Sequence, residues 1–445
     1  MKPLRLPLWT LLSPSLAAYL WLGYVAERAD FTVVLSLFAV LFALYGVAMR
    51  AIQTLHDEKL ALGAAILFRV ALLFSLPNLS DDFYRFIWDG RLLLHGENPF
   101  AKQPSAYSQE ELAMLGLSED LFSKLNSPNY FSVYPALCQL GFWLGAAISP
   151  SSVLLSVVVM KLYLLLFECG TLFLLPKLCT ALGVDKKNAL YYGLNPLVII
   201  EIGGNLHFEA VMIFFLVLTL YLFRSGEDKR TSMIWGGALS LALSASAKLL
   251  SLIFLPVFVR RLGWTRGTTF AMLTVLYAAV LLLLLVPVTS GANFFSSIRL
   301  YFQTFEFNAS FYALARWAAA NLIGGDAAST AGAWLGACTM IAIVGIAFFH
   351  NPKTLRSSAE AMLFSLATYF FFATTIHPWY LATLVALSVV SSYRFALVWS
   401  GMATLSYSAY QSVPYQEQAI LIFIEYALVF GTLVVERRMR ARSEK

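Results

Sequence analysis

Residues 80–100 read SDDFYRFIWDGRLLLHGENPF, and this stretch decides how the rest of the chain is interpreted. It follows an apolar run directly, yet it collects ionisable side chains, namely Asp81, Asp82, Arg85, Asp89, Arg91, His95 and Glu97. If residues 82–94 form a helix, Asp82, Arg85 and Asp89 share one face while Phe83 and Ile87 can lie against lipid. We therefore interpret the stretch as the rim of a site at a membrane surface.

The composition predicts a polytopic membrane protein. Of the 445 residues, 59% are hydrophobic and 13% are charged, and a soluble protein of this length could not bury that much apolar surface. The net charge of +6 comes from Lys and Arg in short loops and at the C-terminus. This distribution indicates how the chain is oriented in the membrane, and it predicts no nucleic-acid partner. The four cysteines have no metal-binding or disulfide spacing.

Three apolar runs, residues 6–25, 31–49 and 59–76, precede the charged stretch. Each is long enough to cross, or nearly cross, about 30 Å of hydrocarbon, and the first is expected to be a retained anchor. Lys2, Arg5, Arg50 and Lys59 place the N-terminus in the cytoplasm by the positive-inside rule, so residues 80–100 emerge on the outer side.

Counting charged loops back from the C-terminus predicts that residues 185–187, DKK, are cytoplasmic. Because residues 80–100 are predicted outside and residues 185–187 inside, an odd number of crossings must separate them. Two apolar runs, residues 131–148 and 153–175, lie between these points. We expect residues 131–148, which open with Tyr134-Pro135 and carry Gln139, to form a re-entrant or surface helix. The alternative is a true span that places DKK outside.

The predicted fold is an all-α polytopic integral membrane protein with about 12–14 transmembrane helices, several of them broken or tilted. We expect one integral membrane domain over residues 1–445. Its parts are the first three spans (1–76), a long outer loop with juxtamembrane helices (77–150), the remaining spans (151–435) and a basic cytoplasmic tail (436–445).

Under this topology, segments far apart in the sequence carry polar side chains to the outer face. They are GGNLHFE (203–209), SAK ending at Lys248, FEFNASFYALAR (305–316) and IHPWY (376–380). An ionisable group at membrane depth costs about 2.5–3.5 kcal/mol on insertion scales, so such groups mark a site or an internal ion pair.

Each of these groups also has a structural explanation. His207 and Glu209 can cap the helix that follows, and Lys248 can pair with an acid such as Glu201 or meet a phosphate. Interfacial anchoring explains Trp379 but leaves His377 unexplained. Structural roles are favoured for Lys161 with Glu168 on one helix face, and for Arg69 and Glu425.

The acidic stretch with its DGR and NPF elements, the Tyr134-Pro135 segment, GGNLHFEAVMIFFLVLTLYL, FEFNASFYALAR and HPWYL occur in an order that resembles bacterial members of the GT-C superfamily. These are multi-span glycosyltransferases that take a sugar from a polyprenyl phosphate, and the likeness is to the mannosyltransferase-like branch over about residues 60–390. Many relatives place the acidic loop after the first span, whereas two extra spans precede it here.

The resemblance implies a general base on the first outer loop, which falls on Asp81 or Asp82, with Asp82 favoured. Attack by an acceptor hydroxyl on the anomeric carbon would invert it, and cations would steady the departing phosphate. The candidates for phosphate binding are Arg85, Arg91, Lys248, His377 and Arg316. The candidates for sugar or acceptor binding are His207, Glu209, Asn308, Tyr134 and Trp379.

The resemblance therefore predicts a hexosyltransferase, with mannose inferred by likeness, in the bacterial inner membrane with its site on the periplasmic face. Its partners would be a polyprenyl-phosphate sugar, a glycolipid, glycan or protein acceptor, and the bilayer. No cofactor or metal is required, although Asp81, Asp82 and Glu209 are able to hold a divalent ion. A membrane glycan ligase or polymerase and a lipid-linked sugar transporter are the alternatives.

Overall fold

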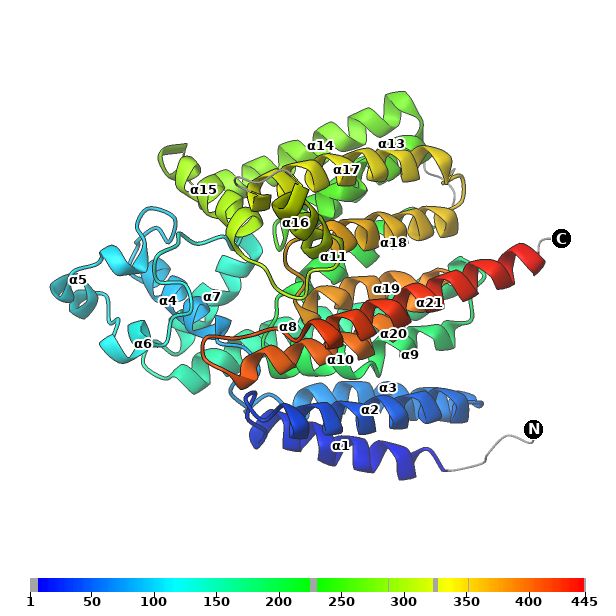
Figure 1. Cartoon of the computed structure of the whole chain (residues 1–445), viewed down its shortest axis with the longest axis horizontal. Helices are drawn as coiled ribbons and strands as arrows, with labels where there is room; N and C mark the ends of the chain where they lie inside the picture. The colour runs from blue at the N-terminus through cyan, green and yellow to red at the C-terminus, as the bar shows by residue number, and fades with distance from the viewer. Residues whose placement is uncertain (1–6, 225–229, 287, 323–326, 351, 444–445) are drawn as a thin grey trace.

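The computed structural model describes residues 7–224, 230–286, 288–322, 327–350 and 352–443. Every regular element within these ranges is helical, apart from an isolated bridge between Phe307 and Thr375. The expected all-α membrane fold is thereby confirmed, and Figure 1 shows most of the long helices running in roughly the same direction.

The chain begins with three helices, α1 (Trp9–Tyr24), α2 (Phe31–Ala51) and α3 (Leu55–Ala71), that lie side by side at the lower edge of Figure 1. Their starts follow from local capping, because the Asp30 side chain accepts from the amide of Val33 and Thr54 forms a capping box with Asp57. The predicted three helices therefore precede the acidic stretch.

The acidic stretch opens a group of short helices at one end of the molecule, at the left of Figure 1. This outer-loop group consists of α4 (Asp82–Leu94), η1 (Pro104–Ala106), α5 (Gln109–Met114), α6 (Glu119–Ser123) and α7 (Ala136–Ile148). A Cβ atom on Gly90 would lie 2.3 Å from the carbonyl oxygen of Phe142, so α4 and α7 meet backbone to backbone and need glycine there.

Helix α7 is the element whose crossing the sequence left open. It has 13 residues, about 20 Å of helix, and packs against the first part of α8 (Val153–Ala181), where the Tyr163 hydroxyl donates to the Leu137 carbonyl over 3.0 Å. Helix α8 has 29 residues, about 43 Å, which exceeds the hydrocarbon thickness of about 30 Å. Helix α8 is thus long enough to cross, while α7 is too short for a straight span and lies along the first part of α8.

The far end of α8 places DKK relative to the acidic stretch. The Lys186 ammonium lies 2.9 Å from the Glu58 carboxylate at the start of α3, the end opposite to α4. DKK and the outer-loop group therefore lie at opposite ends of the bundle, as expected if residues 131–148 do not cross.

The helices after α8 complete the bundle. In chain order they are η2 (Lys186–Asn188), α9 (Ala189–Gly193), α10 (Pro196–Val198), the π-helix η3 (Ile199–Gly204), α11 (Glu209–Leu222), α12 (Thr231–Ala245), η4 (Leu249–Phe254), α13 (Leu255–Leu262), α14 (Trp264–Leu283), α15 (Val288–Thr304), α16 (Phe311–Leu322), α17 (Ala327–Phe349), α18 (Leu355–Phe372), η5 (Pro378–Tyr380), α19 (Leu381–Val390), α20 (Phe395–Met402), η6 (Ala403–Gln411) and α21 (Ala419–Ser443).

Five helices among the described residues are long and apolar enough to cross a membrane alone: α2, α8, α14, α17 from Ala331, and α21. A sixth span results if Pro196–Gly204 and Glu209–Leu222, which are bent by 120°, count as one broken span. Others, such as α12 and Pro378–Val390, are shorter than the roughly 20 residues that a straight span needs. The count of about 12–14 spans stays a prediction.

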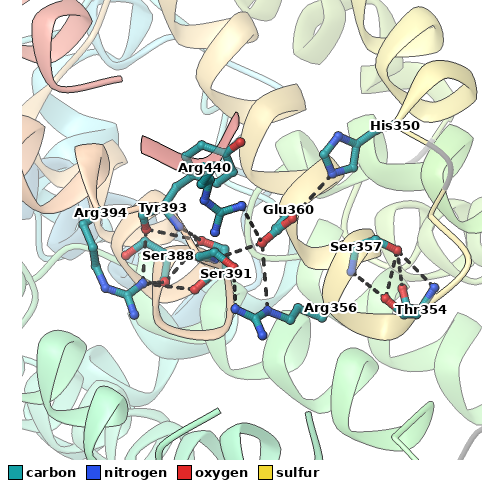
Figure 2. Close-up of polar contacts among 11 residues, drawn as sticks. His350, Thr354, Arg356, Ser357, Glu360, Ser388, Ser391, Tyr393, Arg394 and Arg440 are labelled. Carbon is teal, nitrogen blue, oxygen red and sulfur yellow. Dashed lines mark hydrogen bonds and ion pairs between the residues drawn. The ribbon is translucent and has the colours of Figure 1, made fainter. Parts of the chain in front are cut away.

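The basic loops expected on the cytoplasmic side meet at the end opposite to the outer-loop group. In Figure 2, Glu360 of α18 lies between His350, Arg356 and Arg440, and the first and last of these are each 3.7 Å from its carboxylate. The Glu360 carboxylate also accepts from the amide of Ser392 over 2.9 Å. Two predicted cytoplasmic segments, residues 350–356 and 392–394, and the helix of the basic tail therefore share one end, where α1 begins and α21 ends in Figure 1.

Two buried charges of α8, Lys161 and Glu168, have polar partners on neighbouring elements, but the expected pair between them is wrong. Lys161 and Glu168 do not contact each other: the Arg69 guanidinium lies 2.8 Å from the Glu168 carboxylate, and Lys161 donates to the carbonyls of Leu72 and Ser75. The helix spacing placed both residues on one face correctly, but neighbouring helices supply closer partners. The buried contacts of Arg69, Lys161 and Glu168 agree with the structural roles expected for them.

Candidate active site

The two predicted bases sit at the start of α4 in different environments. The Asp81 carboxylate forms an ion pair with Arg28, from the connection between α1 and α2, and the Arg28 guanidinium lies over the Tyr410 ring. The Asp82 carboxylate instead accepts a 2.7 Å hydrogen bond from the side-chain amide of Asn126. No cation pairs with Asp82 within the described part of the chain.

The surroundings of Asp82 favour its protonated form more than water does. Burial raises the pKa of Asp82, and the negative charges of Asp81 and Glu209 act in the same direction. The positive charge of His207 and the hydrogen bond from Asn126 oppose this rise. Helix α4 packs against the segment that contains His207 and Glu209, because the Phe86 and Phe208 rings lie 5.5 Å apart between centroids.

His207 and Glu209 lie at the break between η3 and α11. The chain turns sharply there, since Leu206 has a φ of +65°. The His207 Nδ1 atom lies 3.0 Å from a carboxylate oxygen of Glu201 and donates to the Glu201 carbonyl oxygen over 3.0 Å. This contact orients the ring and leaves its Nε2 atom buried without a partner among the described residues.

Glu201 organises this break although it is fully buried. Its carboxylate also accepts hydrogen bonds from the Tyr407 hydroxyl and, over 3.2 Å, from the Asn205 amide. Asn205 in turn accepts from the backbone amide of Leu79, three residues before Asp82. The broken span is thereby tied directly to the entrance of the outer-loop group.

Lys248 belongs to a second break, between α12 and η4. Its ammonium lies 2.6 Å from the Glu209 carboxylate and 3.4 Å from the centroid of the Tyr380 ring. The structural partner is therefore Glu209, whereas Glu201, the partner considered from the sequence, binds His207. The Lys248 side chain remains about one-third exposed.

The HPWY segment joins the same site through an aromatic stack. The Trp379 indole lies between two imidazoles, with centroids 3.8 Å from His207 and 4.3 Å from His377, and with interplanar angles of 11° and 3°. The Phe307 ring packs on the far side of His377, with 4.8 Å between centroids. Residues from three distant segments thus form one continuous column of rings.

Arg85 and Arg91 are not brought to this site. Arg85 pairs with Asp89 at 2.8 Å and donates to the carbonyls of Ser127 and Tyr130, while Arg91 donates to the Gly116 carbonyl. Both guanidinium groups are buried within the outer-loop group. The expected phosphate role gains no support from this placement, because a charge pattern cannot distinguish a buried structural pair from a phosphate ligand.

Three further candidates also have structural partners. The Tyr134 ring packs edge-on against Phe86, and Arg316 forms an exposed pair with Glu306 at 3.0 Å. Asn308 is fully buried and donates to Glu425 over 3.0 Å. The structure therefore assembles Asp81, Asp82, His207, Glu209, Lys248, His377 and Trp379, and leaves Arg85, Arg91, Tyr134, Arg316 and Asn308 in supporting positions.

The sequence reasoning missed several residues of the site and gave Glu201 a different partner. Glu201 was considered only as a partner of Lys248, although a carboxylate inside the apolar run LVIIEIGG has to find some partner. Asn126, Arg28 and Tyr407 carried no such signal, since polar residues in loops and tyrosines in apolar helices are common. Only the fold places them beside the acids.

A metal ligand set was the open alternative for the acids. Among the described residues, no three His, Cys, Asp or Glu side chains converge closely enough to hold an ion, so Asp81, Asp82 and Glu209 do not form such a set. The arrangement offers a half-buried carboxylate, a partly exposed lysine side chain and a stack of aromatic rings. These groups suit proton transfer and the binding of a sugar phosphate.

Comparison with known proteins gives a consistent family. A family model described as alpha-(1->6)-mannopyranosyltransferase, N-terminal domain, matches residues 11–264. This range contains Asp82, His207, Glu209 and Lys248, whereas His377 and Trp379 lie beyond it. No solved structure matches significantly.

Two curated mycobacterial proteins are similar to about half of the chain. A probable alpha-(1->6)-mannopyranosyltransferase of Mycolicibacterium smegmatis is 25% identical over 231 residues, 46% of this chain and 40% of that protein. Alpha-(1->6)-mannopyranosyltransferase A of Mycobacterium tuberculosis is 24% identical over 250 residues, 56% of this chain and 46% of that protein. The matches therefore span less than half of either relative. Because the family model covers more than half of the 445 residues and the resemblance to mannosyltransferase-like GT-C enzymes is confirmed, the chain belongs to the alpha-(1->6)-mannopyranosyltransferase family.

Proposed function

We propose that this protein transfers a mannosyl residue from a polyprenyl-phosphate donor to a hydroxyl of a glycolipid, glycan or protein acceptor, with inversion at the anomeric carbon. Family membership and the names of the two relatives support the mannosyl group. The observation that carries the proposal is the position of Asp82, a half-buried carboxylate with a raised pKa beside His207.

The proposed roles follow from the partners of each side chain. Asp82 accepts the proton of the acceptor hydroxyl, because its raised pKa makes it a stronger base than an exposed carboxylate and no cation neutralises it among the described residues. Asp81 is a weaker candidate, since Arg28 already pairs with it. This comparison favours Asp82 as the base.

The departing phosphate is assigned to the side of Lys248. Its side chain is partly exposed and its ammonium is held in place by Glu209 and Tyr380, so it can meet a phosphate oxygen without a large rearrangement. His377 is the second candidate, because its Nδ1 atom has no partner among the described residues. His207, Glu209 and the edge of Trp379 then lie where sugar hydroxyls would bind.

The site is proposed to face the non-cytoplasmic side of the bacterial inner membrane. The basic loops meet at the opposite end of the bundle from the outer-loop group, and positive loops are retained in the cytoplasm. A donor whose prenyl chain lies in the bilayer would present its phosphate at the outer rim, next to α4.

The test is an assay of the purified protein in lipid with labelled donors. We expect transfer from polyprenyl-phosphate mannose and none from a nucleotide-activated mannose, with product analysis showing inversion. Asp82→Asn should lower kcat by about 10²- to 10⁴-fold, whereas Asp81→Asn should cost less than about tenfold. Transfer from the nucleotide donor would refute the donor class, and full activity of Asp82→Asn would refute the base.

A further inference from the structure

Glu425 is a fully buried acid in the apolar first part of α21. Its Oε1 atom accepts from the Asn308 side-chain amide over 3.0 Å and from the Trp399 indole over 2.9 Å. Its Oε2 atom has no hydrogen-bond partner among the described residues, and neither has Oδ1 of Asn308. Two buried acceptor oxygens of the same interacting pair are thus unsatisfied.

A single proton on the Glu425 carboxyl group satisfies both oxygens. An ionised carboxylate can only accept hydrogen bonds, so it cannot satisfy the amide oxygen of Asn308, whereas a carboxylic acid has one O–H donor. We propose that Glu425 is protonated in the folded protein and forms a reciprocal pair with Asn308. The Asn308 Nδ2 group donates to Oε1, and the Glu425 Oε2 hydroxyl donates to Oδ1.

The surroundings of Glu425 favour the neutral form. Its other neighbours are Trp399, Tyr426 and the acid Glu417, and no cationic side chain pairs with it in the described part of the chain. An isolated carboxylate in an apolar interior is very costly, so such a group takes up a proton instead. The two unsatisfied oxygens and the lack of a cationic partner among the described residues therefore both indicate a protonated Glu425.

The pair holds a strained turn. Asn308 has a φ of +51°, its backbone amide donates to Glu417, and its carbonyl oxygen accepts from the Tyr426 hydroxyl over 2.7 Å. An asparagine tolerates this left-handed conformation better than most residues, and three contacts from the α21 side fix it. The α21 segment thus determines the path of residues 305–310.

This turn positions a ring of the candidate active site. The amide of Phe307 donates to the Thr374 carbonyl over 3.1 Å, and the Phe307 carbonyl accepts from the amide of Ile376 over 2.8 Å. The Phe307 ring then rests against His377. Glu425 and Asn308 are therefore positioning residues that act through Phe307, a role that rests on the proposed function.

The protonation state has a readout that needs no activity. Infrared difference spectra of purified wild-type protein and Glu425→Gln should show the carbonyl band of a protonated carboxylic acid in the wild type, sensitive to deuterium and absent from the variant. The band should persist at neutral pH. Its absence from the wild type at neutral pH would overturn the proposal, whether or not the protein transfers mannose.

Variants test the positioning role. Glu425→Gln restores the same donor and acceptor geometry, so kcat/KM should stay within about threefold of wild type, whereas Glu425→Ala should lose about tenfold or more. Asn308→Gly keeps the left-handed backbone without the amide and should behave like Glu425→Ala. If Glu425→Gln is as defective as Glu425→Ala, the acid is needed as a charge and the proposal fails.

Discussion

The imidazole of His207 stacks on the indole of Trp379, with 3.8 Å between ring centroids, although the two residues are 172 positions apart in the sequence. His207 lies at the break between η3 and α11, and Trp379 lies in η5, just before α19. Because His377 stacks on the opposite face of the same indole, one side chain sets the spacing of two imidazoles.

The stack predicts that Trp379 contributes through its shape. An aromatic pair contributes about 0.5–1.5 kcal/mol beyond its buried area, so Trp379→Ala, which removes two pairs, should lower kcat/KM by about tenfold or more. Trp379→Phe should recover most of this loss. Trp235→Ala, which removes an exposed indole on α12, is the control and should leave kcat/KM unchanged. Equal activity of the alanine variants would contradict the role of the stack.

The hydrogen bond from Asn126 predicts a shift in pH dependence. This bond lowers the pKa of Asp82 against the effect of burial, so Asn126→Ala should raise that pKa further. The base acts in its deprotonated form, and activity is lost as pH falls through its pKa. The acidic limb of the kcat/KM profile should therefore move to higher pH in the variant.

Asn129→Ala removes an exposed amide three residues away and serves as the control for this shift. Its profile should match that of the wild type. A limb that stays in place or moves to lower pH in Asn126→Ala would show that Asp82 does not control the acidic side of the profile.

The network around Glu360, at the end opposite to the outer-loop group, predicts a residue that matters for stability alone. In Figure 2, Glu360 lies between His350, Arg356 and Arg440, and its carboxylate accepts from the amide of Ser392. Glu360→Gln removes the negative charge that faces Arg356 and Arg440 and should lower the stability by about 1–3 kcal/mol, seen as an earlier thermal transition. The kcat of the folded fraction should not change, because the site lies at the other end.

Glu110→Gln, an exposed acid on α5, should leave the thermal transition in place. A wild-type melting curve for Glu360→Gln would mean that the network is too solvated to contribute, as exposed ion pairs often are.

The fold was predictable where charge and hydropathy act directly. Lys186 beside Glu58 puts DKK at the end of the bundle opposite to α4, as the basic loops predicted, while the membrane face of each end and the non-crossing of α7 stay predictions. The number of spans was less predictable, because helices such as α12 cross, bend or stop according to what covers their ends. That depends on tertiary contacts which a hydropathy pattern does not contain.

The site was predictable where a polar group stands in apolar sequence. His207, Glu209, Lys248 and Trp379 come together because each has to be satisfied away from water, and the break in the helix is where that can happen. Arg85 met the same criterion, but Asp89 on the next turn of α4 already satisfies it. The sequence alone cannot distinguish a polar side chain that joins the site from one that already has a partner in its own helix.

The arrangement of the two ends predicts which residues are accessible from each side of the membrane. Cysteine labelling should start from a Cys338→Ala background, since Cys338 is the exposed one of the four native cysteines. Glu110→Cys on α5 should react with a membrane-impermeant maleimide in intact spheroplasts, and Lys186→Cys should react only after permeabilisation. Labelling of both positions without permeabilisation would mean that α7 crosses the membrane, and labelling of Lys186→Cys alone would place the candidate active site on the cytoplasmic face.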